Sequence, residues 1–232
     1  MTISLSVSIM HCNDVAGRRA CVAEQMRQLQ HDPRLAFVEV VKDPVREGVW
    51  ATSRRAWKRA GVRGATHHLV IQDDAVLCEG FVGLMLGALE AVPAAPVGPY
   101  CPRKIATEAQ ARGESWCWAP DGVWGVAFCL PTPMVYDFLR WYGPNWAPGS
   151  NAEDGALTAW VHATGVGVWL TVPSLVDHMP GPSLLGHSLE RHAAVWEPSP
   201  TAPNWSHGLA DPVRGTANRP FWRHPDYRGP RP

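Results

Sequence analysis

The sequence lacks several features that would mark other classes of protein. No run of about 18 apolar residues is present in the 232 residues, so we expect no transmembrane helix and no membrane partner. The first residues carry neither a basic region nor a small-residue cleavage site, which predicts no signal peptide and a cytoplasmic protein. The six cysteines form no Cys-x-x-Cys pair, which disfavours a zinc knuckle and a small disulfide scaffold.

The sequence also lacks an excess of charge of either sign. Lys and Arg total 21, and Asp and Glu total 21, so the formal net charge is zero. A protein whose whole surface binds polyanions is therefore disfavoured, although a local basic patch is compatible with this balance. Tryptophan, by contrast, is abundant: 12 Trp accompany only 5 Phe and 4 Tyr. Because the indole ring is large and keeps a polar N–H, Trp lines binding surfaces as well as cores.

The first 100 residues alternate between strand and helix patterns. The patterns predict strands at 3–10, 35–41, 67–72 and 97–100, and helices at 18–29, 49–60 and 81–91. Such alternation predicts an α/β sandwich of the Rossmann type, with a mostly parallel central sheet flanked by helices. Ligands of these sheets bind beyond the carboxyl ends of the strands. The segments that follow the first three strands, at 11–14, 42–46 and 73–75, are therefore candidate site segments.

The second half of the chain is less regular. We expect a polar loop at 102–121, strands at 124–130 and 166–171, and helices at 134–142 and 153–164. Ten of the 22 prolines lie in 179–232 without a helical or strand period, which is typical of an irregular tail that wraps the core or is partly mobile. We therefore expect one domain over 1–186, with a donor half (1–100) and an acceptor half (101–186), followed by the Pro- and Arg-rich tail (187–232).

Two adjacent carboxylates, Asp73 and Asp74, come directly after the apolar strand expected at 67–72. At a buried strand end, such groups repel each other and lose hydration, so they are tolerated when a cation neutralises them. Carboxylate oxygens suit Mg²⁺ or Mn²⁺, which commonly bridge a substrate diphosphate. A solvated turn, or a cap for the following helix, is the alternative interpretation of the pair.

This part of the sequence resembles the donor half of GT-A-fold glycosyltransferases, in particular the lipooligosaccharide-galactosyltransferase type. Residues 48–81 combine a helix, a hydrophobic strand, the acidic motif Asp73-Asp74 and a following Phe81. In that family the acidic motif holds a divalent metal against the diphosphate of a nucleotide-sugar. Gln72 stands where the family often has an acid, so the resemblance leaves open which aspartate binds the metal. We assign the metal to Asp74, and the sugar or ribose hydroxyls to Asp73.

The resemblance extends to other donor-side positions. His11 and Asn13 follow the first strand and are similar to residues near the nucleotide, and Asp43 matches an acidic position that often reads the base. The resemblance implies a phosphate contact for Arg54, although its position is offset by one residue, and another for Ser183, in a segment that resembles a closing loop. A solvated helix face is the alternative for Arg54.

Arg18 and Arg19 lie just beyond the first-strand exit, in the first expected helix. For these two arginines a place near the nucleotide and a solvated helix face are both open.

An acidic motif on the acceptor side, Glu153-Asp154, opens the helix expected at 153–164. A carboxylate there either stabilises the helix N-terminus or accepts a proton from the attacking acceptor hydroxyl. The resemblance favours the catalytic role, with Asp154 ahead of Glu153. A family metal ligand is often a His shortly after the last core strand, and His178 occupies that position. The implied cofactor is Mn²⁺ or Mg²⁺, with a UDP-linked sugar as the expected donor.

Seven of the 12 tryptophans (116, 118, 124, 141, 146, 160 and 169) fall in 116–169, the expected acceptor half. Indole faces stack on sugar rings and on extruded nucleobases. Core packing is the alternative and accounts for those in regular elements. Trp116, Trp118 and Trp146, which we place in loops, are the candidate acceptor-binding residues.

The sequence thus predicts an enzyme, a metal-dependent glycosyltransferase that moves a hexose or pentose from a nucleoside-diphosphate sugar to an acceptor hydroxyl. The Arg- and aromatic-rich tail favours a hydroxymethylated base in DNA as the acceptor, as in some bacteriophage enzymes. A solvated tail whose aromatic rings pack on the core is the alternative interpretation of these residues. A lipopolysaccharide or other surface glycan is the alternative acceptor.

A nucleotidyltransferase is disfavoured because only Gly17 lies in 11–19, where a Gly-rich phosphate loop is needed. A non-catalytic sugar- or nucleotide-binding module remains the alternative of another class. A dehydrogenase is disfavoured because no Gly-x-Gly-x-x-Gly follows the first strand.

Overall fold

A computed structural model describes most of the chain. The described residues are 2–11, 16–43, 48–121, 123–147, 153–180, 192–216, 223 and 225–229. Two of the predicted donor contacts, Asn13 and Ser183, lie outside these residues. None of the helices in the described ranges has the length and apolar character needed to span a membrane.

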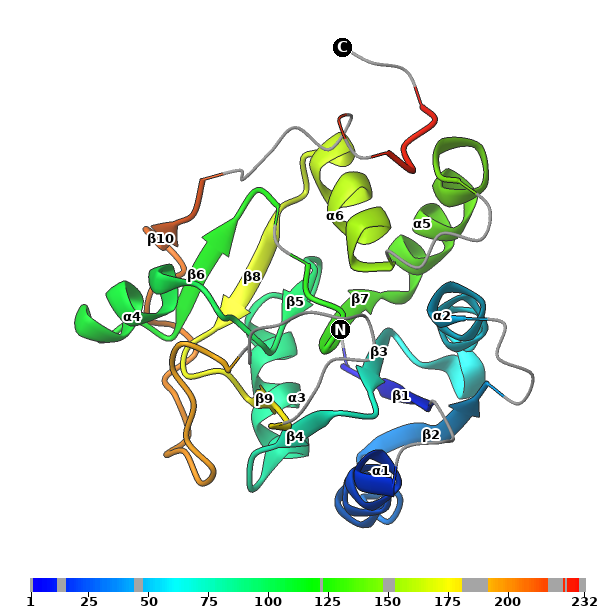
Figure 1. Cartoon of the computed structure of the whole chain (residues 1–232). Coiled ribbons are helices and arrows are strands. Elements are labelled where there is room, and N and C mark those ends of the chain that lie inside the picture. The colour runs from blue at the N-terminus through cyan, green and yellow to red at the C-terminus, as the bar shows by residue number, and fades with distance from the viewer. Residues whose placement is uncertain are drawn as a thin grey trace.

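The described strands form one central sheet and one small sheet (Figure 1). The central sheet has eight strands in the order β10-β6-β8-β5-β7-β3-β1-β2. Its strands are β1 (Leu5–His11), β2 (Leu35–Lys42), β3 (His67–Gln72), β5 (Val97–Gly98), β6 (Trp116–Ala119), β7 (Ala127–Pro131), β8 (Val168–Thr171) and β10 (Val213–Arg214). The small sheet pairs β4 (Ala75–Leu77) with β9 (Val176–His178).

Most strands of the central sheet run in one direction. β1 pairs in parallel with β2 and β3, while β7 is antiparallel to both β3 and β5, and β5 is parallel to β8. Five strands (β1, β2, β3, β5 and β8) therefore share one direction, and β6, β7 and β10 run against them. This confirms the predicted mostly parallel sheet of a Rossmann-type α/β sandwich.

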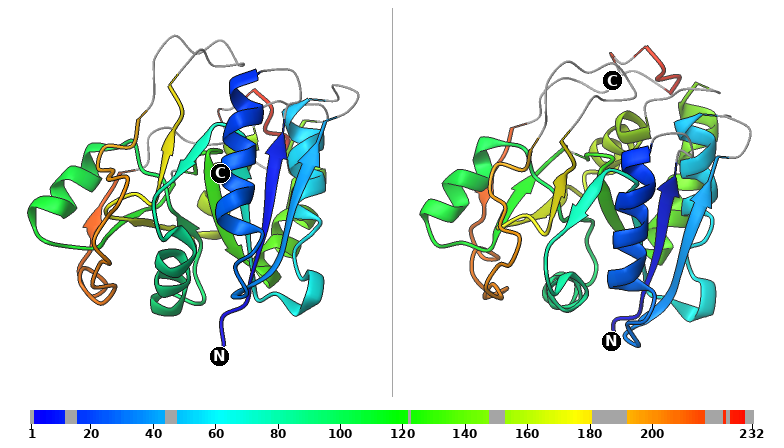
Figure 2. Two further views of the ribbon diagram at one scale, coloured as in Figure 1. Left: turned by 90° about the horizontal axis from the view of Figure 1, so that it is seen from below. Right: turned by 60° about the horizontal axis from the view of Figure 1, so that its bottom comes forward.

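Helices cover both faces of the sheet, as the two turned views in Figure 2 show. On one face lie α1 (Ala16–Leu29) and α3 (Phe81–Ala91), and on the other lie α2 (Val49–Trp57), α5 (Thr132–Asn145) and α6 (Glu153–Thr164). The remaining helices are α4 (Lys104–Ala111), which packs into the same core as α2, and the short η1 (Val62–Gly64).

Strand alternation explains why the sheet has two buried faces. In β1, Leu5, Val7 and Ile9 face the core with α1 and α3, while Met10 faces the core with α2 and α5. A strand with both faces buried is typical of a sheet that forms the central layer of an α/β sandwich, between two layers of helices.

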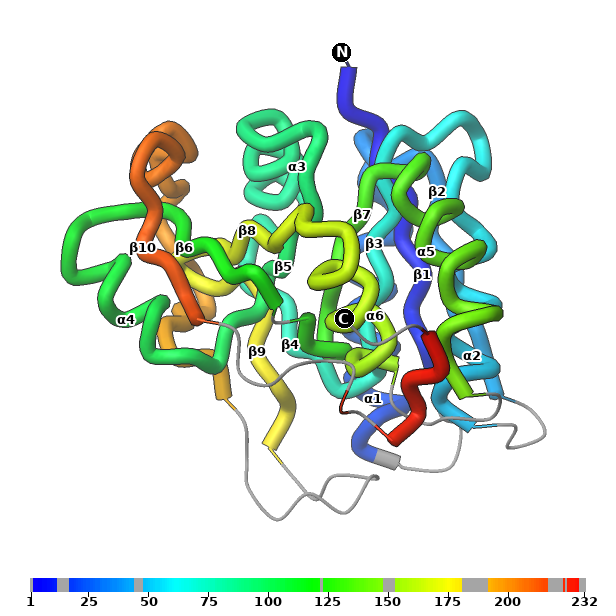
Figure 3. Tube along the Cα trace, turned by 90° about the horizontal axis from the view of Figure 1, so that it is seen from above, coloured from blue at the N-terminus to red at the C-terminus, as the bar shows by residue number. Residues whose placement is uncertain are grey.

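The second half of the chain departs from the sequence prediction. The polar loop expected at 102–121 is wrong, because this segment contains α4 and β6. The strand expected at 124–130 begins later, at Ala127, and the tail contributes β10 to the sheet edge (Figure 3). Trp205 of the tail packs against Trp116, with ring centroids 5.0 Å apart. Local patterns missed these elements because each is at most eight residues long.

Candidate functional site

The candidate site lies at the edge of the sheet where β1 and β3 end. The two strands are parallel, and Met10 of β1 pairs with Gln72 of β3, so their carboxyl ends lie side by side. His11 ends β1, while Asp73 and Asp74 follow β3 directly. The sheet register therefore brings together three of the predicted site residues.

Asp73 and Asp74 are almost completely buried, with exposed fractions of 2% and 3%. The Nδ1 atom of His11 lies 3.0 Å from Oδ2 of Asp73. Arg18, in the first turn of α1, donates from Nη1 to Oδ1 of Asp73 and pairs through Nη2 with Oδ2 of Asp74 at 2.6 Å. In this structure the guanidinium of Arg18 thus lies against both acids and offsets part of their negative charge.

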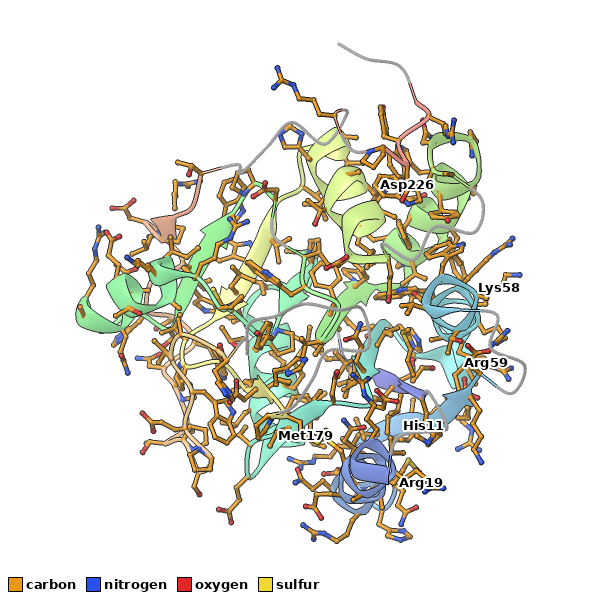
Figure 4. The ribbon with its side chains drawn as sticks, in the orientation of Figure 1. His11, Arg19, Lys58, Arg59, Met179 and Asp226 are labelled. Carbon is orange, nitrogen blue, oxygen red and sulfur yellow. The ribbon has the colours of Figure 1, made fainter. Side chains whose placement is uncertain are left out.

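The small sheet brings His178 to the same acids. β4 and β9 are antiparallel, with Ala75 opposite His178, and the backbone N–H of Met179 donates to the carbonyl oxygen of Asp74 at 2.7 Å. Figure 4 labels Met179, directly after β9, and His11, at the end of β1. As a result, Nε2 of His178 lies 3.3 Å from Oδ2 of Asp74. The two residues predicted to bind metal are therefore neighbours.

The charges of this cluster shift the pKa values of Asp74 and His178 in opposite directions. Burial alone would raise the pKa of Asp74, but the hydrogen bond from His178 and the charge of Arg18 hold it below its usual value. The hydrogen bond to Asp74 raises the pKa of His178, more strongly than burial lowers it. The pair therefore favours an ionised Asp74 beside a His178 that holds its proton to a higher pH than usual.

Two observations bear on whether a divalent metal fits here. Within the described ranges, no group of three or more His, Cys, Asp or Glu side chains is arranged to hold a metal. Asp74 and His178 nevertheless supply two suitable donor atoms, and Oδ1 of Asp74 is buried without a hydrogen-bond partner among the described residues. Mg²⁺ in phosphate sites usually takes only one or two carboxylates plus waters and phosphate oxygens, and carboxylates also suit Mn²⁺, so the residues fit such an ion.

Of the other predicted donor contacts, Asp43 lies near the site. Its backbone N–H donates to the carbonyl oxygen of His11 at 3.1 Å, and its Oδ2 accepts from the N–H of Gly48 at 3.1 Å. Arg54 is exposed on α2, whereas the next residue, Arg55, places Nη2 3.8 Å from Oδ1 of Asp43. The arginine of α2 that reaches this edge of the sheet is therefore Arg55.

On the acceptor side, the structure separates the two acids that open α6. The carboxyl group of Glu153 is buried and accepts a hydrogen bond from Nε1 of Trp57 at 3.2 Å. Burial raises the pKa of Glu153 to about 7, against the opposing effects of Ser53 and Trp57. Glu153 therefore belongs to the packing between α2 and α6.

Asp154 lies beside the end of β3. It is half-buried, and its Oδ1 accepts from the N–H of Gly155 at 2.9 Å. A Cβ atom added to Gly125 would come 3.8 Å from Cβ of Asp154 and 2.6 Å from Nε2 of Gln72. Asp154 and Gln72 thus flank Gly125, and Gln72 is the residue that directly precedes Asp73.

The three tryptophans predicted to bind the acceptor are packed against other parts of the protein. The loop placement of Trp116 and Trp118 is wrong, because both belong to β6. Trp116 is fully buried and Trp146 is 1% exposed, so neither ring face is open to a ligand. The half-buried ring of Trp118 packs against Arg214, whose Cζ lies 5.0 Å from the ring centroid. Packing thus accounts for the positions of all three rings.

Arg18 is the site residue whose pairing sequence analysis missed. The sequence placed it near the nucleotide or on a solvated helix face, and gave no signal that it spans both aspartates. Such a signal was available only in three dimensions, because α1 must lie over β4 for Arg18 to reach Asp73 and Asp74.

Comparisons with known proteins give only distant similarities. No known protein family matches the sequence, and no curated protein matches it. The mannose-1-phosphate geranyltransferase of Thermus thermophilus is 12% identical, with 74% of this chain and 74% of that chain covered and a TM-score of 0.39. The protein A197 from STIV is 10% identical, with 84% of this chain and 97% of that chain covered and a TM-score of 0.44. TM-scores this low, at such identities, identify neither a family nor a function.

Proposed function

We propose that the protein is a transferase of the GT-A type that moves a sugar from a nucleoside-diphosphate sugar to an acceptor hydroxyl. The observation that carries this proposal is the contact of His178 with Asp74, beside buried Asp73, where parallel β1 and β3 end. Rossmann-type sheets bind their ligands at this edge. A buried pair of acids with an imidazole suits a cation-bound diphosphate better than it suits an uncharged ligand.

On the donor side, the chain's own residues have distinct roles in this proposal. Asp74 and His178 would hold Mn²⁺ or Mg²⁺, and the ion would neutralise the negative charge that develops on the leaving diphosphate. Asp73, fixed by His11 and Arg18, would accept hydrogen bonds from sugar or ribose hydroxyls. Asp43, which is anchored to the backbone of His11, would contact the base.

On the acceptor side, Asp154 is the residue that we assign to the attacking hydroxyl. It is half-buried in the first turn of α6, so water reaches its carboxyl group less freely than at an open surface. If the reaction inverts the anomeric centre, Asp154 would accept the proton of the hydroxyl as it attacks. If the reaction retains the configuration, Asp154 would orient the acceptor. Glu153 is buried against Trp57 and would support the helix end.

Release of nucleoside diphosphate tests the proposed reaction. The wild type is incubated with a panel of nucleotide-sugars, with and without Mn²⁺ or Mg²⁺, and compared with Asp74→Asn and His178→Gln. Asp137→Asn and His31→Gln are matched controls, because Asp137 lies on the exposed part of α5 and His31 is exposed after α1. We expect metal-dependent release that only the first two variants lose. Release without metal, or full activity in both, contradicts the proposal.

For the acceptor, we propose a hydroxymethylated base in DNA. One feature of the described residues supports it: residues 49–64 contain five basic and no acidic side chains, and Arg54, Lys58 and Arg63 are exposed, as is Arg59, which pairs with Glu39 at 2.9 Å. Such a patch favours contact with phosphates, even in a chain of zero net charge. Mass spectrometry of hydroxymethylated DNA, after incubation with the enzyme and its donor, tests the proposal. An added sugar mass is expected, whereas sugar found only on a glycan acceptor contradicts it.

A further inference from the structure

Arg18 is a buried arginine whose guanidinium contacts two carboxylates. It lies in the first turn of α1, is 9% exposed, and reaches the carboxylates of both Asp73 and Asp74. The adjacent Arg19 is exposed on the same helix (Figure 4). One guanidinium can satisfy two acids at once through its two NH₂ groups, which a single ammonium group does less well. The fork of Arg18 is thus matched to the spacing of the aspartate pair.

The contacts of Asp74 create a competition between cations. Its Oδ2 atom is shared by Nη2 of Arg18 at 2.6 Å and Nε2 of His178 at 3.3 Å, while Oδ1 has no partner among the described residues. A divalent ion held by Asp74 and His178 would lie next to the positive guanidinium. Because like charges repel strongly where water is largely excluded, both cannot keep their best contacts with Asp74.

We propose that Arg18 is a resident counter-cation, which neutralises the two aspartates until a divalent ion displaces it from Asp74. The Nη2 group freed from Asp74 then pairs with the diphosphate of the donor, a group that guanidinium binds well. This inference rests on the proposed function, because it takes Asp74 and His178 as the ligands of the ion.

Displacement of Arg18 makes the binding of metal and the binding of diphosphate depend on each other. A metal ion that binds alone must break the contact of Arg18 with buried Asp74, which leaves Nη2 without a new partner while Nη1 keeps its contact with Asp73. A diphosphate supplies that new partner, so it strengthens metal binding, and by linkage the metal strengthens diphosphate binding by the same factor. Without a side chain at position 18 that competes for Asp74, this part of the coupling disappears.

Titration with Mn²⁺, followed by electron paramagnetic resonance of the free ion, tests the proposal without any need for turnover. Arg18→Gln is compared with wild type and with the neighbouring control Arg19→Gln, each with and without UDP. We expect Arg18→Gln to bind Mn²⁺ alone about tenfold more tightly than wild type, because the binding-competent state is no longer masked. We also expect UDP to strengthen Mn²⁺ binding less in Arg18→Gln than in the other two proteins.

Arg18→Lys is a second variant, which shows whether the result for Arg18→Gln comes from the lost contact with Asp74 or from poor folding. Lysine keeps one positive charge but cannot span both aspartates in the same way, so its affinity for Mn²⁺ alone should lie between those of wild type and Arg18→Gln. Thermal unfolding with and without Mn²⁺ gives a second measure, in which Mn²⁺ should raise the melting temperature of Arg18→Gln more than that of wild type.

The outcomes separate this inference from the proposed function. If UDP and Mn²⁺ bind together but the three proteins bind Mn²⁺ equally well, Arg18 does not compete with the metal, and the inference fails while the proposed function stands. If Arg18→Gln binds Mn²⁺ more weakly than wild type, Arg18 supports the metal site and the inference also fails. If wild type binds no Mn²⁺ even with UDP, both the inference and the proposed metal dependence fail.

Discussion

His178 places its Nε2 atom 3.3 Å from Oδ2 of Asp74, although the two residues belong to different halves of the sequence. The antiparallel pairing of β4 with β9 makes this contact, because it sets Ala75 opposite His178. The same pairing places the imidazole of His178 beside the carboxyl end of β3, in contact with buried Asp74. The proposed donor site is therefore a product of the topology, and its acids carry consequences for stability as well as for binding.

The first prediction concerns the stability that His178 contributes at low pH. The contact with Asp74 raises the pKa of His178 above 6.5, so the folded state holds this proton more tightly than the unfolded state. The contribution is present in full below pH 6.5 and is lost as the pH rises through the raised pKa. In EDTA, we expect His178→Gln to lower the free energy of unfolding by about 1 kcal/mol at about pH 6 and by much less at about pH 9. Urea unfolding at both pH values checks this, and an equal loss at the two contradicts it.

The second prediction concerns the buried carboxyl group of Glu153. Its pKa is raised from 4.5 to about 7, so ionisation at neutral pH is easier in the unfolded state. For an acid with a raised pKa, stability falls as the pH rises from 4.5 to about 7. Glu153→Gln keeps an acceptor for the N–H of Trp57 and should raise the free energy of unfolding by about 2 kcal/mol at about pH 8, with little change at about pH 5. Urea unfolding that shows no gain at the higher pH would exclude this account.

The third prediction compares two glycines of α3. A Cβ atom at Gly83 would meet only the exposed end of the Arg34 side chain, at 3.0 Å, whereas a Cβ atom at Gly87 would lie 2.8 Å from Nε1 of the Trp205 ring. Gly83→Ala should raise the free energy of unfolding by about 0.5–1 kcal/mol, through helix propensity. Gly87→Ala should instead lower it by about 1 kcal/mol, because the Trp205 ring must shift. If thermal melts show the same sign for both, Trp205 does not pack on α3 as the structure shows.

The parts of the fold that the sequence predicted well are those with strong local patterns. β3 and α3 have the predicted bounds, because an apolar run and a helical period each continue to a clear break. α4 was missed because it is only eight residues long and its fully buried residues, Ala106 and Ala109, are small. β6 was missed because four residues are too short to show an alternation.

The sequence predicted which acids belong to the candidate site, but not which side chains they contact. The positions of Asp73 and Asp74 follow from where β3 ends, which a sequence pattern can indicate. His178 was predicted from the family resemblance, because the short β9 that it ends gives no local pattern. The pairing of Arg18 with both acids depends on how α1 packs over β4, and the burial of Trp116 depends on a tail that lies far along the chain. No local pattern contains such long-range information.

The central claim is that Asp74 holds a divalent cation beside the donor diphosphate. Its most direct test is the affinity for Mn²⁺ in the presence of UDP, measured by electron paramagnetic resonance for wild type and for Asp74→Asn. We predict that wild type binds Mn²⁺ and that Asp74→Asn weakens this binding by about 100-fold, equal to about 2.7 kcal/mol. Equal affinity in the two proteins would contradict the account.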